Sequence, residues 1–192
     1  MMTLFSNAGF VCRKAAAASI AVAALVLTGC ANHPAPVNYA PTSTKTIQGS
    51  LSVAPFTYLP ATPKAAKVVP ANVIRNTAMG EIKIDKDVSV FVRDAVFLEL
   101  RTMGAKIDNP AKVLNGEIEE FLVDDLGYSI DWTLRIKYTV TDTSSTKVLF
   151  SSVKNTQRKT AKFVNPFGAM NETIKLNTEQ LVDDPEFMKA IQ

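Results

Sequence analysis

The clearest pattern in the chain is a strict alternation of apolar and polar residues from Ser129 to Asp142. Side chains of a β-strand point alternately to the two faces of a sheet, so this period of two predicts a strand with one buried face. The residues from Asp142 to Thr146 predict a hairpin loop, and Lys147 to roughly Thr160 is expected to return as the partner strand. The apolar positions of the series are Ile130, Trp132, Leu134, Ile136, Tyr138 and Val140.

Apolar residues at helical spacing predict three helices in the second half of the chain. Asp85 or Asp87 can cap the first helix by accepting hydrogen bonds from its free N–H groups, and Gly104 can end it in a left-handed turn. The helices are expected over Val88–Met103, over Phe167–Val182 after the Asn165-Pro166 break, and over a short segment that begins at Asp184-Pro185.

The other short apolar segments predict further strands, and a proline-containing stretch between them predicts one long loop. Together with the helices they predict an α+β domain, in which a single antiparallel sheet carries helices on one face. Trp132 lies centrally in the alternating series, so we expect it in the core under a helix, and the alternative is an exposed binding residue. The further segments are a first strand ending at Pro55, a loop over Leu59–Ala71, a short strand or hairpin arm within 76–84, a short strand over Ala105–Ile107, and a strand over Val113–Val123.

The N-terminus has the layout of a secretory signal peptide. Arg13 and Lys14 precede an uncharged run of 14 residues, Ala15–Thr28. A helix needs about 20 residues to cross a bilayer, so we do not expect a retained transmembrane helix. The run ends at Leu27-Thr28-Gly29-Cys30, which resembles the lipobox of bacterial lipoproteins. This resemblance implies cleavage between Gly29 and Cys30 and a lipid on Cys30, and the alternative is an ordinary signal with a chance cysteine.

A proline-rich segment follows the cleavage site. Residues 31–46 contain three prolines and few apolar residues, which is typical of a flexible tether. At about 3.1 Å per residue, it could lift the domain by up to roughly 50 Å. The chain is therefore divided into a signal peptide (1–29), a lipidated cysteine with a disordered tether (30–46) and a periplasmic α+β domain (47–192). The 163 residues that follow the signal peptide suffice for one domain.

Charge and cysteine content restrict the function further. The signal peptide holds two bases and no acid, so the net charge falls from +3 to +1 when it is removed. A near-neutral chain gives no general reason to expect nucleic acid as a partner. The two cysteines are Cys12, which is removed with the signal, and Cys30. The mature domain is therefore expected to fold without a disulfide.

The sequence contains little that points to catalysis. The only histidine, His33, lies in the predicted tether, and there is no nucleophile elbow, phosphate loop or Cys/His metal spacing. We therefore expect no enzyme, no metal and no cofactor other than the lipid on Cys30. One alternative stays open, because Glu117 and Glu119 share a strand face and paired carboxylates can hydrolyse glycans such as peptidoglycan. The other interpretation of these acids is a solvated strand surface.

A basic run near the end of the last predicted strand is the second candidate site. It could bind lipid headgroups or an anionic glycan. The alternative is an edge strand whose lysines prevent edge-to-edge aggregation. The run consists of Lys154, Arg158, Lys159 and Lys162.

Three segments carry a resemblance to a known family. They are VSVFVRDAVFLELRTMGAKI (88–107), KVLNGEIEEFLVDD (112–125) and SIDWTLRIKYTVTD (129–142). With the lipobox and the short tether they resemble the YajG-like family of bacterial lipoproteins, although residues 57–80 depart from it and no motif is chemically distinctive. The resemblance implies a lipid-anchored envelope lipoprotein without a known activity. Related small lipoproteins activate peptidoglycan synthases or serve as auxiliary subunits of lipid transport systems.

The residue after Cys30 bears on the final location. In enteric bacteria an Asp at this position commonly retains a lipoprotein in the inner membrane, and here it is Ala31. We therefore expect a lipid-anchored protein of the outer membrane that faces the periplasm, in preference to the inner membrane. The partners that this location implies are the membrane itself and an envelope protein complex or peptidoglycan. The oligomeric state does not follow from the sequence.

Overall fold

The computed structural model describes residues 34–77, 81–162 and 165–192. The chain divides into two units, Met1–Pro34 and Ala35–Gln192, and the folded domain is the second of them. The predicted signal peptide, Cys30 and His33 lie outside the described residues.

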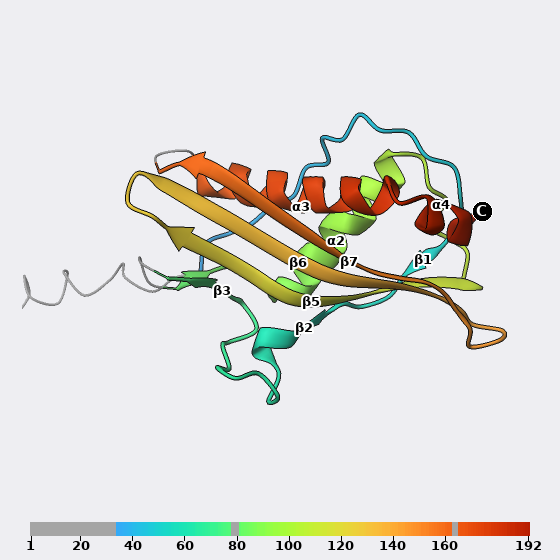
Figure 1. The fold of residues 1–192 in the computed structure, drawn as a ribbon, viewed down its shortest axis with the longest axis horizontal. Coiled ribbons are helices and arrows are strands. Elements are labelled where there is room, and N and C mark those ends of the chain that lie inside the picture. The colour runs from blue at the N-terminus through green and yellow to red at the C-terminus, as the bar shows by residue number, and fades with distance from the viewer. Residues whose placement is uncertain (1–33, 78–80, 163–164) are drawn as a thin grey trace, which may run out of the picture. The chain divides into compact units, whose positions relative to one another are not determined.

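Three long antiparallel strands form most of the sheet (Figure 1). They are β5 (Lys112–Asp125), β6 (Ser129–Asp142) and β7 (Val148–Ala161), each of 14 residues. Ile136 of β6 lies opposite Ile118 of β5 on one side and Lys154 of β7 on the other. All six apolar residues of the alternating series are buried, so the prediction of a one-sided strand is confirmed.

The other edge of β5 is completed by three short segments, one after another. β1 (Ser52–Val53), β2 (Thr57–Tyr58) and β3 (Val73–Asn76) all run parallel to β5, and β4 (Ile82–Lys83) pairs antiparallel with β3. The α+β prediction is thus confirmed, but the sheet is mixed rather than antiparallel throughout. Strands of two to four residues are too short to show a period, and their direction is set by distant pairing with β5.

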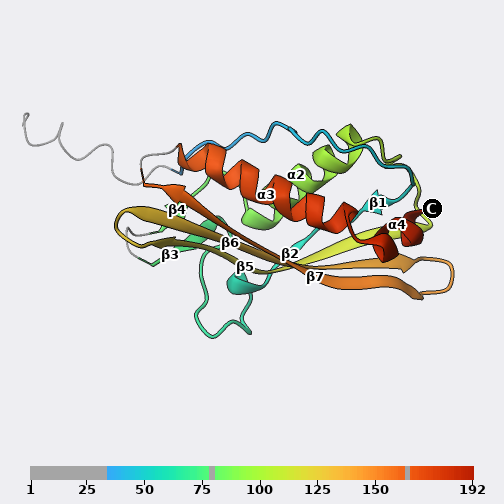
Figure 2. The ribbon, with the colours of Figure 1, turned by 45° about the horizontal axis from the view of Figure 1, so that its top comes forward.

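The helices lie on one face of the sheet (Figure 2). α2 begins after Asp87, whose side chain makes no capping hydrogen bond, and the chain leaves it through Gly104 at φ 105°. Asn165 caps α3 by accepting from the Phe167 N–H, and Asp184 caps α4 by accepting from the Glu186 N–H. The bounds are α2 (Val88–Thr102), α3 (Pro166–Val182) and α4 (Pro185–Ile191), which confirms the three predicted helices.

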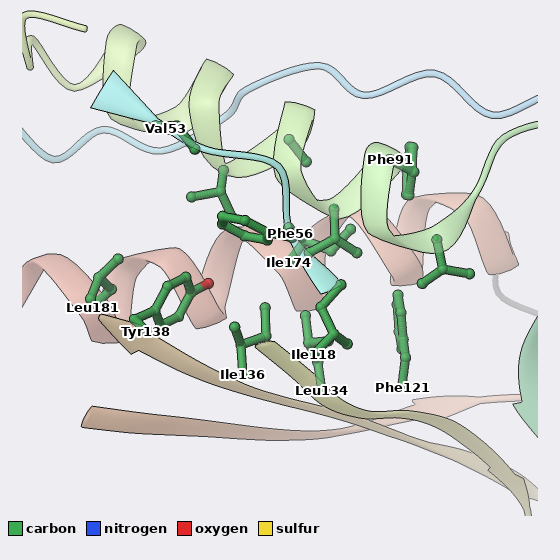
Figure 3. Close-up of a cluster of buried hydrophobic side chains, with 14 of the residues drawn as sticks. Val53, Phe56, Phe91, Ile118, Phe121, Leu134, Ile136, Tyr138, Ile174 and Leu181 are labelled. Carbon is green, nitrogen blue, oxygen red and sulfur yellow. The ribbon is translucent and has the colours of Figure 1, made fainter. Parts of the chain in front are cut away.

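The core fills the layer between these helices and the sheet, as Figure 3 shows for Tyr138, Leu134 and Phe121 below Ile174 and Phe56. The Phe56 ring packs directly against the backbone of β5, and this requires a glycine at position 116. A Cβ atom at Gly116 would lie only 2.7 Å from the Phe56 ring. A larger residue at this position would therefore displace the ring from the core.

Trp132 is buried as predicted, with only 2% of its surface exposed. Its indole Nε1–H donates a hydrogen bond of 3.1 Å to the Oγ1 of Thr160 on β7. The polar edge of the ring is therefore satisfied within the core.

Residues 35–46 differ from the predicted tether, because they pack against α2 and α3. Val37 is buried and its backbone N–H donates to the Asp85 carboxylate. Tyr39 contacts the Phe91 ring edge to face, and the Asn171 side chain donates to the Asn38 carbonyl. Composition could not reveal this packing because the partners lie far along the chain. The tether prediction is left with residues 31–34, of which 31–33 lie outside the described residues, and the folded domain begins at Ala35 instead of 47.

Two further segments, the predicted strand over 105–107 and the predicted loop over 59–71, differ in detail from the prediction. Ala105–Ile107 forms no strand, and only Lys106 makes an isolated bridge with Ser50. The predicted loop after β2 opens with a 3-10 turn, η1 (Leu59–Ala61). Both segments lie beside the short parallel strands, where local sequence carries little information.

Candidate functional site

The two glutamates of the hydrolase alternative lie on the sheet face opposite the helices. Glu117 pairs with Lys137 at 3.1 Å, and Glu119 pairs with Arg135 at 2.7 Å. The strand register shifts between Ile118 and Glu120, so Glu119 occupies a β-bulge. Each carboxylate therefore has its own cation from β6.

The basic run does not form one surface, because Lys154 and Arg158 lie on the helix side of β7, Lys159 lies on the opposite face, and Lys162 follows the strand. Lys154 lies on the helix side and pairs with Asp184 at 2.6 Å. Arg158 donates to the Ala169 carbonyl of α3. Lys159 lies on the opposite face near Asp131, and Lys162 follows the strand and pairs with Asp125 at 3.0 Å. The four bases therefore do not lie together on one surface, and the binding of lipid headgroups or an anionic glycan by this run stays a prediction.

The ion pair between Lys154 and Asp184 is the most enclosed of the four contacts. The two side chains are 13% and 20% exposed. The hydrogen bond from Lys154 holds the pKa of the Asp184 carboxyl below its usual range. Because Asp184 also caps α4, this pair joins the end of the chain to β7.

A buried acid that sequence reasoning missed holds the N-terminal segment. Glu99 of α2 is fully buried. Its Oε1 accepts from the Tyr39 hydroxyl at 2.6 Å and from the Thr42 N–H at 3.0 Å, and its Oε2 accepts from the Ser43 N–H at 3.3 Å. Burial and the adjacent Glu99 raise the pKa of the Tyr39 hydroxyl, which stays protonated as a donor. The one signal in the sequence that could have revealed this contact is the position of Glu99, an acid on the apolar side of the predicted helix.

The β5–β6 turn presents exposed apolar side chains, which a simple polar turn would not carry. Leu126 is 52% exposed and Tyr128 is 98% exposed. The turn is well ordered locally, since the Asp125 carboxylate accepts from the Gly127 N–H at 2.9 Å and the Leu126 N–H donates to the Ser129 carbonyl. The first of these hydrogen bonds, with that from Lys162, lowers the pKa of Asp125.

A third exposed apolar residue lies at the same end of the domain. Phe167 in the first turn of α3 is 37% exposed. The Lys162 N–H donates to the Tyr128 carbonyl, so the chain passes from the turn to α3 within a few residues. Figures 1 and 2 both place the β5–β6 turn and the start of α3 at the same end of the sheet. We call Leu126, Tyr128 and Phe167 the turn surface.

The described part of the chain offers neither a metal site nor a membrane-spanning helix. Within residues 34–77, 81–162 and 165–192, no group of three or more His, Cys, Asp or Glu side chains could hold a metal ion. In the same ranges no helix is both long and apolar enough to span a bilayer.

Comparison with known proteins establishes the fold. No family model matches the chain, and no curated protein matches it. Among solved structures, protein XCC0632 from Xanthomonas campestris, described by the family model DUF330, superposes with a TM-score of 0.59 at 13% identity, over 82% of this chain and 95% of that one. The chain therefore has the fold of this DUF330 protein.

Two more distant structures are similar over most of their length. CT253 from Chlamydia trachomatis gives a TM-score of 0.49 at 11% identity, over 75% of this chain and 99% of that one. A minor lipoprotein from Acinetobacter baumannii gives 0.40 at 10% identity, over 72% and 92%. Similarities at these identities and scores carry no information about function, which must come from the residues of this chain.

Proposed function

We propose that this protein is a lipid-anchored lipoprotein of the bacterial cell envelope, with a non-catalytic accessory or interaction domain facing the periplasm. The observation that carries the proposal is the motif Leu27-Thr28-Gly29-Cys30 at the end of a 14-residue apolar run that follows Arg13 and Lys14. The lipid on Cys30 would be the only covalently bound group, and the domain would serve a partner at the membrane.

The finer assignments belong to the same proposal. Ala31 in place of Asp supports the outer membrane. The segments 88–107, 112–125 and 129–142 support membership of the YajG-like family. The proposed partner is an envelope protein complex or peptidoglycan. The same resemblance also supports a second possibility, that the protein is an auxiliary subunit of a lipid transport system.

The test is lipid attachment at Cys30. Cys30→Ser should block processing, because a hydroxyl group cannot form the thioether. Palmitate labelling measures lipid attachment, and the mass of the mature N-terminus measures cleavage of the signal peptide. Cys12→Ser is the matched control, since Cys12 lies upstream of the apolar run and should leave labelling and cleavage unchanged. An unmodified mature protein that begins at another residue would overturn the proposal, and recovery only with the inner membrane would overturn the outer-membrane assignment.

The hydrolase alternative has its own measurement. A zymogram with purified peptidoglycan should show no clearing by the wild-type protein, because Glu117 and Glu119 are each held by a cation. Clearing by the wild type that disappears in Glu117→Gln or Glu119→Gln would replace the accessory role by a catalytic one.

A further inference from the structure

The distance between the proposed anchor and the folded domain is short. Ala35 is held on both sides of its backbone: its N–H donates to the Lys83 carbonyl, and its carbonyl accepts from the Asp85 N–H. Cys30 precedes it by five residues, which span at most about 18 Å when fully extended. A lipid on Cys30 would therefore keep Ala35 within that distance of the bilayer surface, far less than the roughly 50 Å of a flexible 16-residue tether.

The direction of the backbone at Ala35 decides which end of the domain faces the bilayer. Ala35 runs parallel to Ile84, which follows β4. β4 is antiparallel to β3, and β3 ends beside Val123 of β5, close to the β5–β6 turn. The chain therefore enters the domain from the side of this turn. Figure 2 agrees, because the first described residues and the β5–β6 turn lie at the same end.

The two turns of the central sheet differ in chemistry. The β5–β6 turn carries Leu126 and Tyr128 into solvent, and α3, whose first turn holds the exposed Phe167, begins at the same end of the sheet. The β6–β7 turn consists of the polar residues 143–146. The 14 residues of β6 separate the two turns by about 45 Å. At the β6–β7 end the exposed apolar side chain is Val148 at the start of β7, which is 53% exposed and outside the polar turn. The turn that itself carries exposed apolar residues, Leu126 and Tyr128, is the one on the side from which the chain enters.

The charges at this end balance one another. Lys162 pairs with Asp125, and Lys159 lies 3.8 Å from Asp131. Attraction to anionic headgroups is therefore weak, and apolar contact must supply the interaction. A tyrosine suits this position, because its ring enters the boundary between headgroups and acyl chains while its hydroxyl stays hydrated.

We propose that the turn surface is a lipid-contact surface that rests in the headgroup region of the membrane carrying the anchor. This inference depends on the lipidation of Cys30 proposed above. The contact would fix the orientation of the domain, so that the β6–β7 turn and the C-terminus point away from the bilayer. The lipid anchor retains the protein, and the turn surface orients it.

The experiment measures the depth of a single nitroxide label in the full-length lipidated protein. The mature chain has no thiol besides Cys30, which the lipid would block, so Tyr128→Cys provides a unique site. Ser145→Cys on the β6–β7 turn is the matched control, because it is also exposed on a turn of the same sheet. The protein is reconstituted in vesicles of phosphatidylethanolamine and phosphatidylglycerol. Collision rates with oxygen, which enters lipid, and with a water-soluble nickel chelate report the depth.

The expected result is a several-fold lower nickel collision rate and a higher oxygen collision rate at position 128 than at position 145. High salt or phosphatidylcholine vesicles should change neither rate, because the contact is apolar. Equal accessibility at both positions in a protein of confirmed lipidated mass would overturn this inference alone. Nickel shielding at 128 without the rise in oxygen, and dependent on protein density, would indicate a second copy and would also overturn it. A free Cys30 thiol with no vesicle binding would overturn the proposed function together with it.

Discussion

Trp132 shows how one side chain connects the sheet to its edge strand. Its indole ring lies among the largest fully buried side chains, and its N–H reaches Thr160 of β7. The Thr160 hydroxyl in turn donates to the Ile130 carbonyl, at 3.4 Å. Burial of the ring could be predicted from its place in the alternating series, but the hydrogen-bond partner could not, because the register between β6 and β7 is needed to find it.

We expect Trp132→Ala to lower the free energy of unfolding by about 3–5 kcal/mol, through lost burial and the remaining cavity. Urea unfolding followed by circular dichroism measures this loss. Lys137→Ala is the control, because its ion pair with Glu117 lies on the half-exposed outer face, and it should cost under about 0.5 kcal/mol. Similar losses in the two variants would show that Trp132 does not support the core.

The pair Lys154–Asp184 makes part of the stability depend on pH. The pKa of Asp184 is depressed in the folded protein, chiefly by the hydrogen bond from Lys154. Such a carboxyl contributes stability above its unfolded pKa of about 3.9, and the contribution disappears as the pH falls through the folded pKa. Lys154→Met should therefore be less stable than the wild type at neutral pH, and the difference should shrink below about pH 4.

Urea unfolding at a series of pH values measures the difference between Lys154→Met and the wild type. Lys159→Met is the matched control, because Lys159 lies 3.8 Å from Asp131 and both side chains are well exposed. Its stability difference should be small at every pH. A difference for Lys154→Met that stays constant from neutral to acidic pH would exclude the ion pair as its cause.

At the scale of elements, the helices and the long strands were predictable, and the short strands were predictable only in part. β1 and β4 lie within segments that the sequence predicts as strands, whereas β2 and most of β3 do not. β6 and α3 carry their own period or caps, so the local sequence suffices to find them. β1, β2 and β3 have two to four residues each and are fixed by pairing with β5. The same holds for residues 35–46, which have the composition of a tether and are held by groups of α2 and α3.

Glu99→Ala should release the N-terminal segment while the sheet stays folded. The variant leaves the Tyr39 hydroxyl and the N–H groups of Thr42 and Ser43 without their acceptor, and each lost buried hydrogen bond costs about 1–3 kcal/mol. Hydrogen exchange measured by mass spectrometry should show faster exchange across residues 35–46.

Asp94→Ala is the control for this change, because Asp94 lies on the same helix, is half exposed and pairs with the neighbouring Arg93. It should leave exchange across 35–46 unaltered. Protection of this segment that persists in Glu99→Ala would mean that the packing of Val37 and Tyr39 holds it without the buried acid.

At the scale of the whole molecule, the sequence predicted the α+β class, whereas the contacts of the candidate site residues became visible only in the structure. Glu117 and Glu119 do share the outer face, but each has a cation that only the strand register reveals. The four bases separate because positions in a strand alternate between faces. The turn surface did have a signal, since Leu126 and Tyr128 are apolar residues between the strands predicted over Val113–Val123 and Ser129–Asp142. Its importance follows only from the place where Ala35 enters the domain.

The three short strands on the edge of β5 impose an order on folding. Ser52 pairs with Val113 and Arg75 with Leu122, so β1, β2 and β3 each need a partner that lies many residues later in the chain. A polypeptide grows from its N-terminus, and contacts of large sequence separation form slowly because loop closure must come first. The central hairpins of β5, β6 and β7 join neighbouring segments and can form as a nucleus. We therefore expect β1, β2 and β3 to join the domain last, and to be accessible to chaperones and proteases in a newly made chain until then.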